Sequence, residues 1–471
     1  MSMTRMIFLC LAISAVLLGG CTMIPKYTRP EAPVPKEWPK GQAYRELGSL
    51  QDAPAAADLH WNAFFTDERL QKVIETALEN NRDLRVAALN VERARALYRI
   101  QRFELLPKVN ATGTGYKERV PSDVSTSGRS MTVEEYRADL GITSWEIDFF
   151  GRIRSLKEQA LEEFFATEHA RRSAQILLVS EVTRTYLVLA ADRENLQLAR
   201  STLEAQQASY ELIRRRFEVG LAPKLDLRQV QQRVDASRVD VARFTELTAR
   251  DRNALNLLVG APVPDELLPE GLSSVKSLPD ISPGLSSEVL LHRPDILQAE
   301  SLLKAANANI GAARAAFFPR ISLTTVFGTA SDELSDLFGS GTDTWRFEPR
   351  ASIPIFDPGL WPALRVSKVE REIALARYES AIQTAFREVS DALATKGTVA
   401  DQLEAQKSMV EATAETYQLA NARYEKGIDT YLSVLDAQRS LYAAQQGLIT
   451  IRLGKVANQV SLYAALGGGA Q

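Results

Sequence analysis

Two long segments of the chain repeat apolar residues every seven positions. They cover residues 152–217 and 360–424, with no proline after Pro362. In the first segment the repeating positions are Val182, Leu189, Leu196, Leu203, Tyr210 and Phe217. A seven-residue period predicts coiled-coil packing, because it keeps one stripe of a helix against its neighbour. A continuous helix of this length would extend about 100 Å, so we expect each to span a distance rather than fold inside a compact domain.

Each long segment is followed by a second helical segment with the same period. Its apolar positions are Leu227, Val234, Val241 and Leu255 in the first case, and Val434, Leu441, Leu448 and Leu462 in the second. Short turns at residues 219–224 and 426–430 join the segments, which predicts antiparallel pairs within residues 152–259 and 360–466. Many seam positions are Ala, Ser or Thr, which favours close helices arranged as a wall.

Two other regions alternate apolar and polar residues, as strands do. In residues 320–355 one face would carry Ile321, Leu323, Phe327 and Phe347, and the other Arg320, Ser322, Arg346 and Glu348. Residues 108–149 form a similar candidate hairpin around a loop at 121–130. A single such hairpin is equally typical of a soluble sheet. Two at equivalent places favour a barrel with Ile321, Leu323, Phe327 and Phe347 facing lipid.

The second half of the chain repeats the first. Pro107-Lys108-Val109 returns as Pro319-Arg320-Ile321, and residues 216–221 return as residues 423–428. The unit is about 210 residues, far longer than solenoid repeats. We predict a first repeat at 59–260, a proline-containing linker at 261–284, a second repeat at 285–467 and a flexible glycine tail at 468–471. A duplicated unit of this size predicts a pseudo-symmetric wall.

The N-terminus has the pattern of an export signal. Arg5 precedes the apolar residues 7–18, and Leu18-Gly19-Gly20-Cys21 follows. This resembles a bacterial lipobox and predicts a signal peptide at 1–20 with Cys21 as the lipid anchor; an incidental cysteine is the alternative. The resemblance to lipoproteins also implies the destination: an Asp after the cysteine is linked there to retention in the inner membrane, so Thr22 implies the outer membrane. Residues 21–58 are rich in proline and predict an extended arm. No other stretch has 18 consecutive apolar residues, so we expect strands to cross the bilayer.

Composition excludes several other functions. The net charge is -3 without a basic block, which disfavours nucleic-acid binding. Both cysteines lie near the start, and His60, His169 and His292 are too far apart for a helical metal pair, so we expect no metal site. We find no nucleophile motif and no phosphate-binding glycine loop, and therefore expect neither an enzyme nor a cofactor.

Taken together, this order of segments resembles the TolC-type outer-membrane factors of tripartite efflux pumps. Matching motifs lie at residues 145–152, 293–296, 312–319, 354–356 and 431–439. They look closest to the lipoprotein branch serving multidrug pumps of the OprM kind. The resemblance implies a mainly α fold with a membrane β-barrel: a homotrimer with a 12-stranded barrel, continued by an α-helical periplasmic tunnel. It also implies a periplasmic adaptor and an inner-membrane RND-type pump as partners.

The resemblance further implies a gate at the periplasmic tip, formed by Leu432, Asp436, Arg439 and Tyr424. Ser433 and Asp429 depart from the pattern of some relatives, so the chain has one clear candidate carboxylate ring, at Asp436. The alternative is an ordinary ion pair between Asp436 and Arg439 on a solvated helix. At the level of function, we expect a passive exit duct for drugs, solvents or other small toxic compounds. The competing interpretation is a non-conducting lipoprotein spacer in the envelope.

Overall fold

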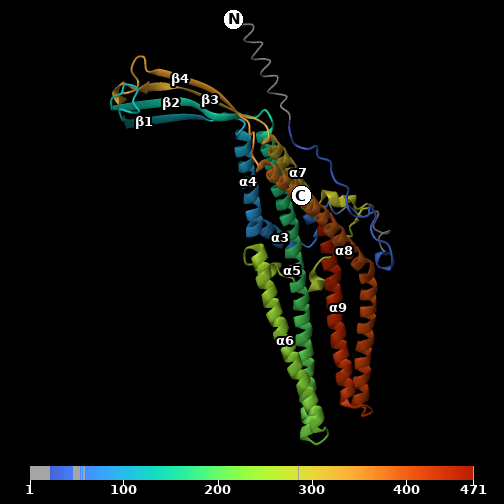
Figure 1. Cartoon of the computed structure of the whole chain (residues 1–471). Helices are drawn as coiled ribbons and strands as arrows, with labels where there is room; N and C mark the ends of the chain where they lie inside the picture. The colour runs from blue at the N-terminus through green and yellow to red at the C-terminus, as the bar shows by residue number, and fades with distance from the viewer. Residues whose placement is uncertain (1–21, 46–53, 55, 57–58, 285, 470–471) are drawn as a thin grey trace. The chain divides into compact units, whose positions relative to one another are not determined.

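The computed structural model describes residues 22–45, 54, 56, 59–284 and 286–469 (Figure 1). The order of a helix, a hairpin and a long helix pair occurs twice. The first set is α2 (Trp61–Phe64), α3 (Glu68–Asn80), α4 (Arg82–Phe103), β1 (Val109–Val120), β2 (Met131–Ile147), α5 (Arg152–Glu218) and α6 (Lys224–Val259). The second is α7 (Pro294–Ala315), β3 (Arg320–Ser331), β4 (Asp343–Ser352), α8 (Leu360–Glu425) and α9 (Tyr431–Ala465). Short 3-10 helices accompany them in the described part of the chain, among them η3 (Asp265–Leu267), η4 (Leu272–Ser274), η5 (Ser287–His292) and η6 (Leu334–Asp336).

The described residues fall into two compact units. One comprises residues 91–167 and 299–378 with the arm up to residue 30, and the other contains the remaining stretches. The first unit holds the sheet, and α5 and α8 continue from it into the second. The expected long helices are present: α5 has 67 residues and α8 has 66.

The four strands form one antiparallel sheet in the order β1-β2-β3-β4 (Figure 1). Residues directly opposite one another share a face, and the register therefore assigns every side chain to a side. Over most of the sheet one face is apolar: Val109, Ala111, Leu140, Ile142, Trp145, Ile147, Ile321, Leu323, Phe327, Trp345, Phe347 and Ala351. The other face carries Asn110, Asp139, Glu146, Ser322, Arg346, Glu348 and Arg350.

A β-bulge in β2 explains why the first hairpin alternates less clearly in sequence. The register shifts between Ile142 and Trp145, and Ser144 has a positive φ of 55°. Its backbone N–H donates to Thr324 Oγ1 at 3.1 Å. The extra residue keeps Trp145 on the same face as Ile142 despite their odd spacing. β2 begins at Met131, directly after the loop expected at residues 121–130.

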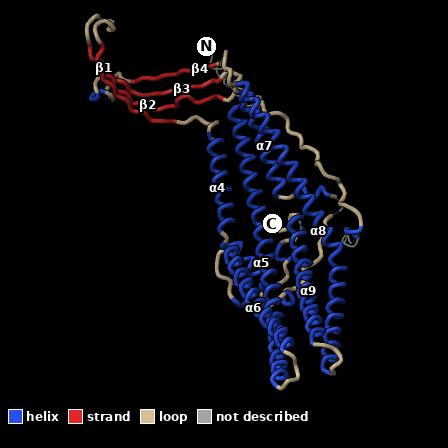
Figure 2. The backbone as a smooth tube through the Cα atoms, turned by 60° about the horizontal axis from the view of Figure 1, so that its bottom comes forward, coloured by secondary structure: helices blue, strands red, loops and turns tan. Residues whose placement is uncertain are grey.

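The long helices pair as antiparallel hairpins, α5 with α6 and α8 with α9 (Figure 2). An 18-residue window of α5 is apolar enough to cross a membrane, which we did not expect from the sequence, but most of it is buried inside the protein. That burial is typical of a packed helix. Side chains of α5 are buried at seven-residue intervals, including Ala199, Gln206 and Ile213, and Ile213 packs with Val230 of α6.

The two repeats are closed by equivalent contacts. In the second repeat, Arg293 donates to the carbonyl of Ala465 at 2.7 Å and to Glu388 at 3.0 Å. In the first repeat, Asn81 Nδ2 donates to the carbonyl of Leu258 at 2.8 Å. Each contact ties a helix start to the end of the last helix of its repeat and satisfies a carbonyl that the helix itself leaves free.

The arm and the tail are both held by contacts. Asn307 Nδ2 donates to the carbonyl of Pro25 at 2.8 Å, and Arg314 donates to that of Met23 at 3.2 Å. Gly469, placed by the sequence in a flexible tail, accepts a hydrogen bond from Gln175 at 3.2 Å, so the described part of the tail is packed. Cys21 and the expected signal peptide lie outside the described residues.

Candidate functional site

The two helix turns at residues 219–223 and 426–430 lie beside a shared hydrophobic cluster. Its buried members come from three helices: Ile213 of α5, Val230 of α6, and Tyr431, Val434 and Leu435 of α9. Tyr417, Ala420 and Tyr424 of α8 pack against it. The turns of the two helix pairs are therefore joined to one another, rather than lying side by side without contact.

A direct polar contact reinforces this junction. Arg216 Nη1 of α5 donates to Tyr424 Oη of α8 at 3.0 Å, and its guanidinium carbon lies 5.4 Å from the centre of the same ring. Tyr424 also meets Tyr431 edge to face, with ring centres 5.0 Å apart. Tyr424 is thus a contact point between the first helix pair and the second. The hydrogen bond and the cation–π contact are each worth of order 1 kcal/mol.

The α8–α9 turn is braced by an exposed ion pair. Arg423 Nε and Nη2 donate to the Asp429 carboxylate at 2.6 and 3.1 Å. Hydrogen bonds from Arg423 hold the pKa of Asp429 below its usual range. This two-point geometry is specific to Arg and carboxylate. Asp429 therefore fixes the shape of this turn.

The other expected gate residues lie on the exposed side of α9. Leu432 is half exposed, and Asp436 pairs with Arg439 at 3.3 Å with both side chains more than half exposed. Their neighbours Tyr431, Val434 and Leu435 face the cluster instead. An exposed pair one helical turn apart contributes little to stability. Leu432, Asp436 and Arg439 are therefore available to face another surface or water.

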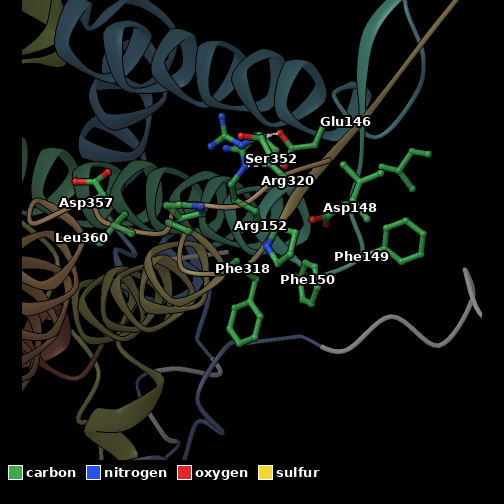
Figure 3. A pocket seen from close by; sticks show the side chains of 16 residues that line it. Glu146, Asp148, Phe149, Phe150, Arg152, Phe318, Arg320, Ser352, Asp357 and Leu360 are labelled. Carbon is green, nitrogen blue, oxygen red and sulfur yellow. Dashed lines mark hydrogen bonds and ion pairs between the residues drawn. The ribbon is translucent and has the colours of Figure 1, made fainter. Parts of the chain in front are cut away.

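A second polar cluster lies where strands meet helices (Figure 3). Arg152, the first residue of α5, donates to both oxygens of Glu146 at 2.8 and 2.7 Å, and Arg320 lies 3.6 Å from the same carboxylate. Phe150 stacks on Phe318 with ring centres 4.9 Å apart. They line a cavity of about 280 Å³. Its charges are mutually satisfied, which fits a rigid joint between sheet and helices rather than a reactive centre.

The expected membrane-facing residues share one face of the sheet. Ile321 and Leu323 are half-buried, whereas Phe327 and Phe347 are 66% and 61% exposed. Leu140 and Trp345, opposite Phe327 on either side, are also exposed. A face with so many large exposed apolar side chains indicates contact with another apolar surface, such as a membrane or a protein partner.

Sequence reasoning did not identify Arg216 as a site residue. The available signal was the repeat itself, because Arg216 and Arg423 occupy the same place in the two turn motifs. Both arginines make the principal polar contact of their turn. Within the described residues there is no cluster of three or more His, Cys, Asp or Glu side chains able to hold a metal.

Comparisons with known proteins agree with this architecture. The family described as "Outer membrane efflux protein" matches residues 73–261 and 285–468. The chain belongs to this family. It is 48% identical to the toluene efflux pump outer membrane protein TtgC of Pseudomonas putida, covering 98% of this chain and 95% of that protein. It is 42% identical to OprJ of Pseudomonas aeruginosa, covering 97% and 94% of the two proteins.

Solved structures show the same fold. A membrane protein from Pseudomonas aeruginosa superposes with a TM-score of 0.88 at 40% identity, covering 95% of this chain and all of that one. The open state of the Neisseria gonorrhoeae MtrE outer membrane channel gives 0.83 at 36% identity, covering 96% and 99%. The expected TolC-type fold is confirmed, and the chain is an outer-membrane efflux channel component. Its family consists of channels rather than enzymes.

Proposed function

We propose that this protein is a passive exit duct for small toxic organic compounds, opened and closed at the turns of its two long helix pairs. It acts in the outer membrane as a homotrimer, with a helical extension into the periplasm. A periplasmic adaptor and an inner-membrane transporter deliver its substrates. The names of its relatives refer to toluene, solvent and antibiotic efflux, which favours small organic substrates.

The division of the sheet into an apolar and a charged face carries this proposal. Such a sheet separates two solvents, and β1 and β4 each have a neighbour on one side only. Unpaired strand edges are not viable within lipid, so the free edges require further strands. Three copies of four strands provide a closed 12-stranded barrel with the apolar face towards lipid and the charged face towards the lumen.

The arm contacts support Cys21 as the lipid anchor. The carbonyl of Met23 is bound by Arg314, near the end of α7 and six residues before β3 begins at Arg320. Residue 23 is thereby held beside the segment that leads into the sheet. A lipid on Cys21 would enter the membrane near the base of the strands.

The contacts at the turns support the proposed gate. Arg216 and Tyr424 tie α5 to α8, and such a tie favours the closed arrangement. In a trimer, Leu432 and Asp436 would form rings at the entrance, where leucines narrow the bore and carboxylates attract cations. Leu432 and Asp436 are both exposed in the single chain, as expected for side chains that face the trimer axis.

Conductance measurements test the proposal. The purified protein reconstituted in a planar bilayer should give discrete channels, whereas an envelope spacer would give none. Tyr424→Phe keeps the ring and removes only the hydrogen bond from Arg216, so we expect a larger mean conductance than in the wild type. Tyr417→Phe, which alters a neighbouring tyrosine on α8, is the matched control. The gate assignment fails if both variants conduct like the wild type, even where the channel itself is confirmed.

A further inference from the structure

The seam between α5 and α6 contains facing layers at seven-residue intervals from the turn. Ile213 lies with Val230 in the cluster near the turn. Extending this register by seven residues at a time pairs Gln206 with Ser237 and then Ala199 with Phe244, and all four side chains are buried. A layer in this register is normally filled by apolar or small side chains.

The fourth layer instead places two acids opposite one another, Asp192 on α5 and Asp251 on α6. The two carboxyl groups lie within hydrogen-bonding reach of each other, and the Asn195 side chain lies within reach of Asp192. Two ionised carboxylates can only accept hydrogen bonds, so this contact requires a proton. The Oδ2 atom of Asp251 is buried and receives no hydrogen bond from an N–H or O–H donor among the described residues, so a proton on either carboxyl would satisfy it.

Nearby cations do not neutralise the pair, because they are already engaged. On α6, Arg243 binds Asp240 at 3.0 Å, and Arg250 lies 3.4 Å from Glu246. Both weakly favour the ionised form of the nearer aspartate.

Charged side chains on the surrounding elements are also paired with other groups. On α5, Arg193 donates to the carbonyl of Pro269 at 2.7 Å, while Glu194 pairs with Arg452 of α9 at 2.6 Å. The 3-10 helix η3 places Asp265 on Arg252 of α6 at 2.7 Å. The helix α3 meets α6 near its end, through the bond from Asn81 to the Leu258 carbonyl. These contacts supply no free cation to the pair.

We propose that Asp192 and Asp251 form a proton-operated latch between α5 and α6. While one proton is shared, the two carboxyl groups hold the helices together. When the proton is lost, two like charges face each other in the seam and loosen it. The latch is independent of the proposed gate residues, since it concerns the packing of a single helix pair.

The direction of the pH effect follows from the environment of the pair. Burial, and then the charge of Asp192, raise the pKa of Asp251 to about 6 from its usual 3.8, and burial also raises the pKa of Asp192. The unfolded chain then loses its protons at lower pH than the folded one. The penalty is absent in strong acid, grows as pH rises, and is complete above about pH 6. Each unit of raised pKa changes the opening equilibrium about tenfold, so Asp251 alone provides roughly a hundredfold.

The second repeat provides a comparison within the molecule. The positions equivalent to Asp192 and Asp251 are Val399 and Asn458 on α8 and α9. Val399 is buried, and Asn458 Nδ2 donates to the carbonyl of Ala392 at 2.9 Å. Neither side chain can ionise. The latch therefore acts on one helix pair of each chain and has no counterpart at the equivalent positions of the other.

Infrared spectroscopy of the purified full-length trimer tests the shared proton. We expect a protonated carboxyl band that titrates near pH 6 and that is absent from both Asp192→Asn and Asp251→Asn. Subtracting variant from wild-type spectra removes other acids with raised pKa values, such as Glu162. The shared proton is refuted if the wild-type and variant spectra coincide between pH 5 and 7.5.

Spin-label distances test the latch itself. Labels at Gln197→Cys and Ala249→Cys, both exposed, report the α5–α6 separation in trimers that contain one doubly labelled chain. The distribution should widen from pH 5 to pH 8, and Asp251→Asn should abolish the change. Asp235→Asn, an exposed acid paired with Arg238, should retain it. A wild-type distribution that is the same at both pH values would show that the proton does not control the seam.

Discussion

At the scale of single residues, the strand register determines whether a charge can be accommodated. Leu323 lies between Trp145 and Pro349 on the apolar face, whereas Ser322 lies between Glu146 and Arg350 on the charged face. If the apolar face meets lipid, Leu323→Arg should cost roughly 2 to 4 kcal/mol near the bilayer midplane and less towards an interface. We expect a large loss of assembled trimer on unheated gels for this variant.

Ser322→Arg is the control, because it adds the same side chain one position away and places it near the Glu146 carboxylate. Trimer yield should remain close to that of the wild type. Equal losses in the two variants would mean that the apolar face is not the one in lipid.

At the scale of elements, the arm packs tightly on α7. A Cβ atom added at Gly311 would lie 2.6 Å from Ser155 Oγ and 2.9 Å from the backbone nitrogen of Ile24. The backbone of the arm cannot avoid this clash without moving. We therefore expect Gly311→Val to release residues 22–30 from α7, which limited proteolysis followed by mass spectrometry would detect as new cleavage within the arm.

The matched control is Gly454→Val on α9, where an added Cβ meets nothing within 4 Å. It makes the same change inside a helix without displacing the arm. An unchanged cleavage pattern in Gly311→Val would show that the arm is held by other contacts, such as that of Asn307 with Pro25.

At the scale of the whole molecule, the candidate gate residues act through the trimer, because a ring forms only when copies meet. If Asp436 lies near the trimer axis as proposed, Asp436→Ala removes a ring of three carboxylates together with their contacts to Arg439. We expect higher single-channel conductance and weaker cation preference, measured in planar bilayers with a salt gradient. Leu432→Ala should widen the bore without changing ion preference. Asp235→Asn, on α6 of the other helix pair, should leave both conductance and ion preference unaltered.

Most of the helices and strands could be predicted from the sequence, because the spacing of apolar residues depends on the local type of secondary structure. Seven-residue spacing predicted both ends of α5 and α8 to within one residue. In helices this long, a single residue that departs from the spacing does not obscure the pattern. The turns at 219–224 and 426–430 were identified as the short connections between segments that carry the seven-residue pattern. The second hairpin was clear, whereas the bulge at Ser144 obscured the first, because an extra residue reverses the alternation.

What only the tertiary structure decided are the contacts between segments distant in the chain. The pairing of Arg216 with Tyr424 joins two helix pairs that are some 200 residues apart, and no local pattern encodes it. In the sequence, Asp251 only interrupts the seven-residue spacing of Val230, Phe244 and Leu258. Asp192 could be recognised as its partner only once the two helices were in register. Periodicity specifies the face that a residue occupies, because it depends on the geometry of one element. The identity of the group opposite depends on packing, which is set by the fold as a whole.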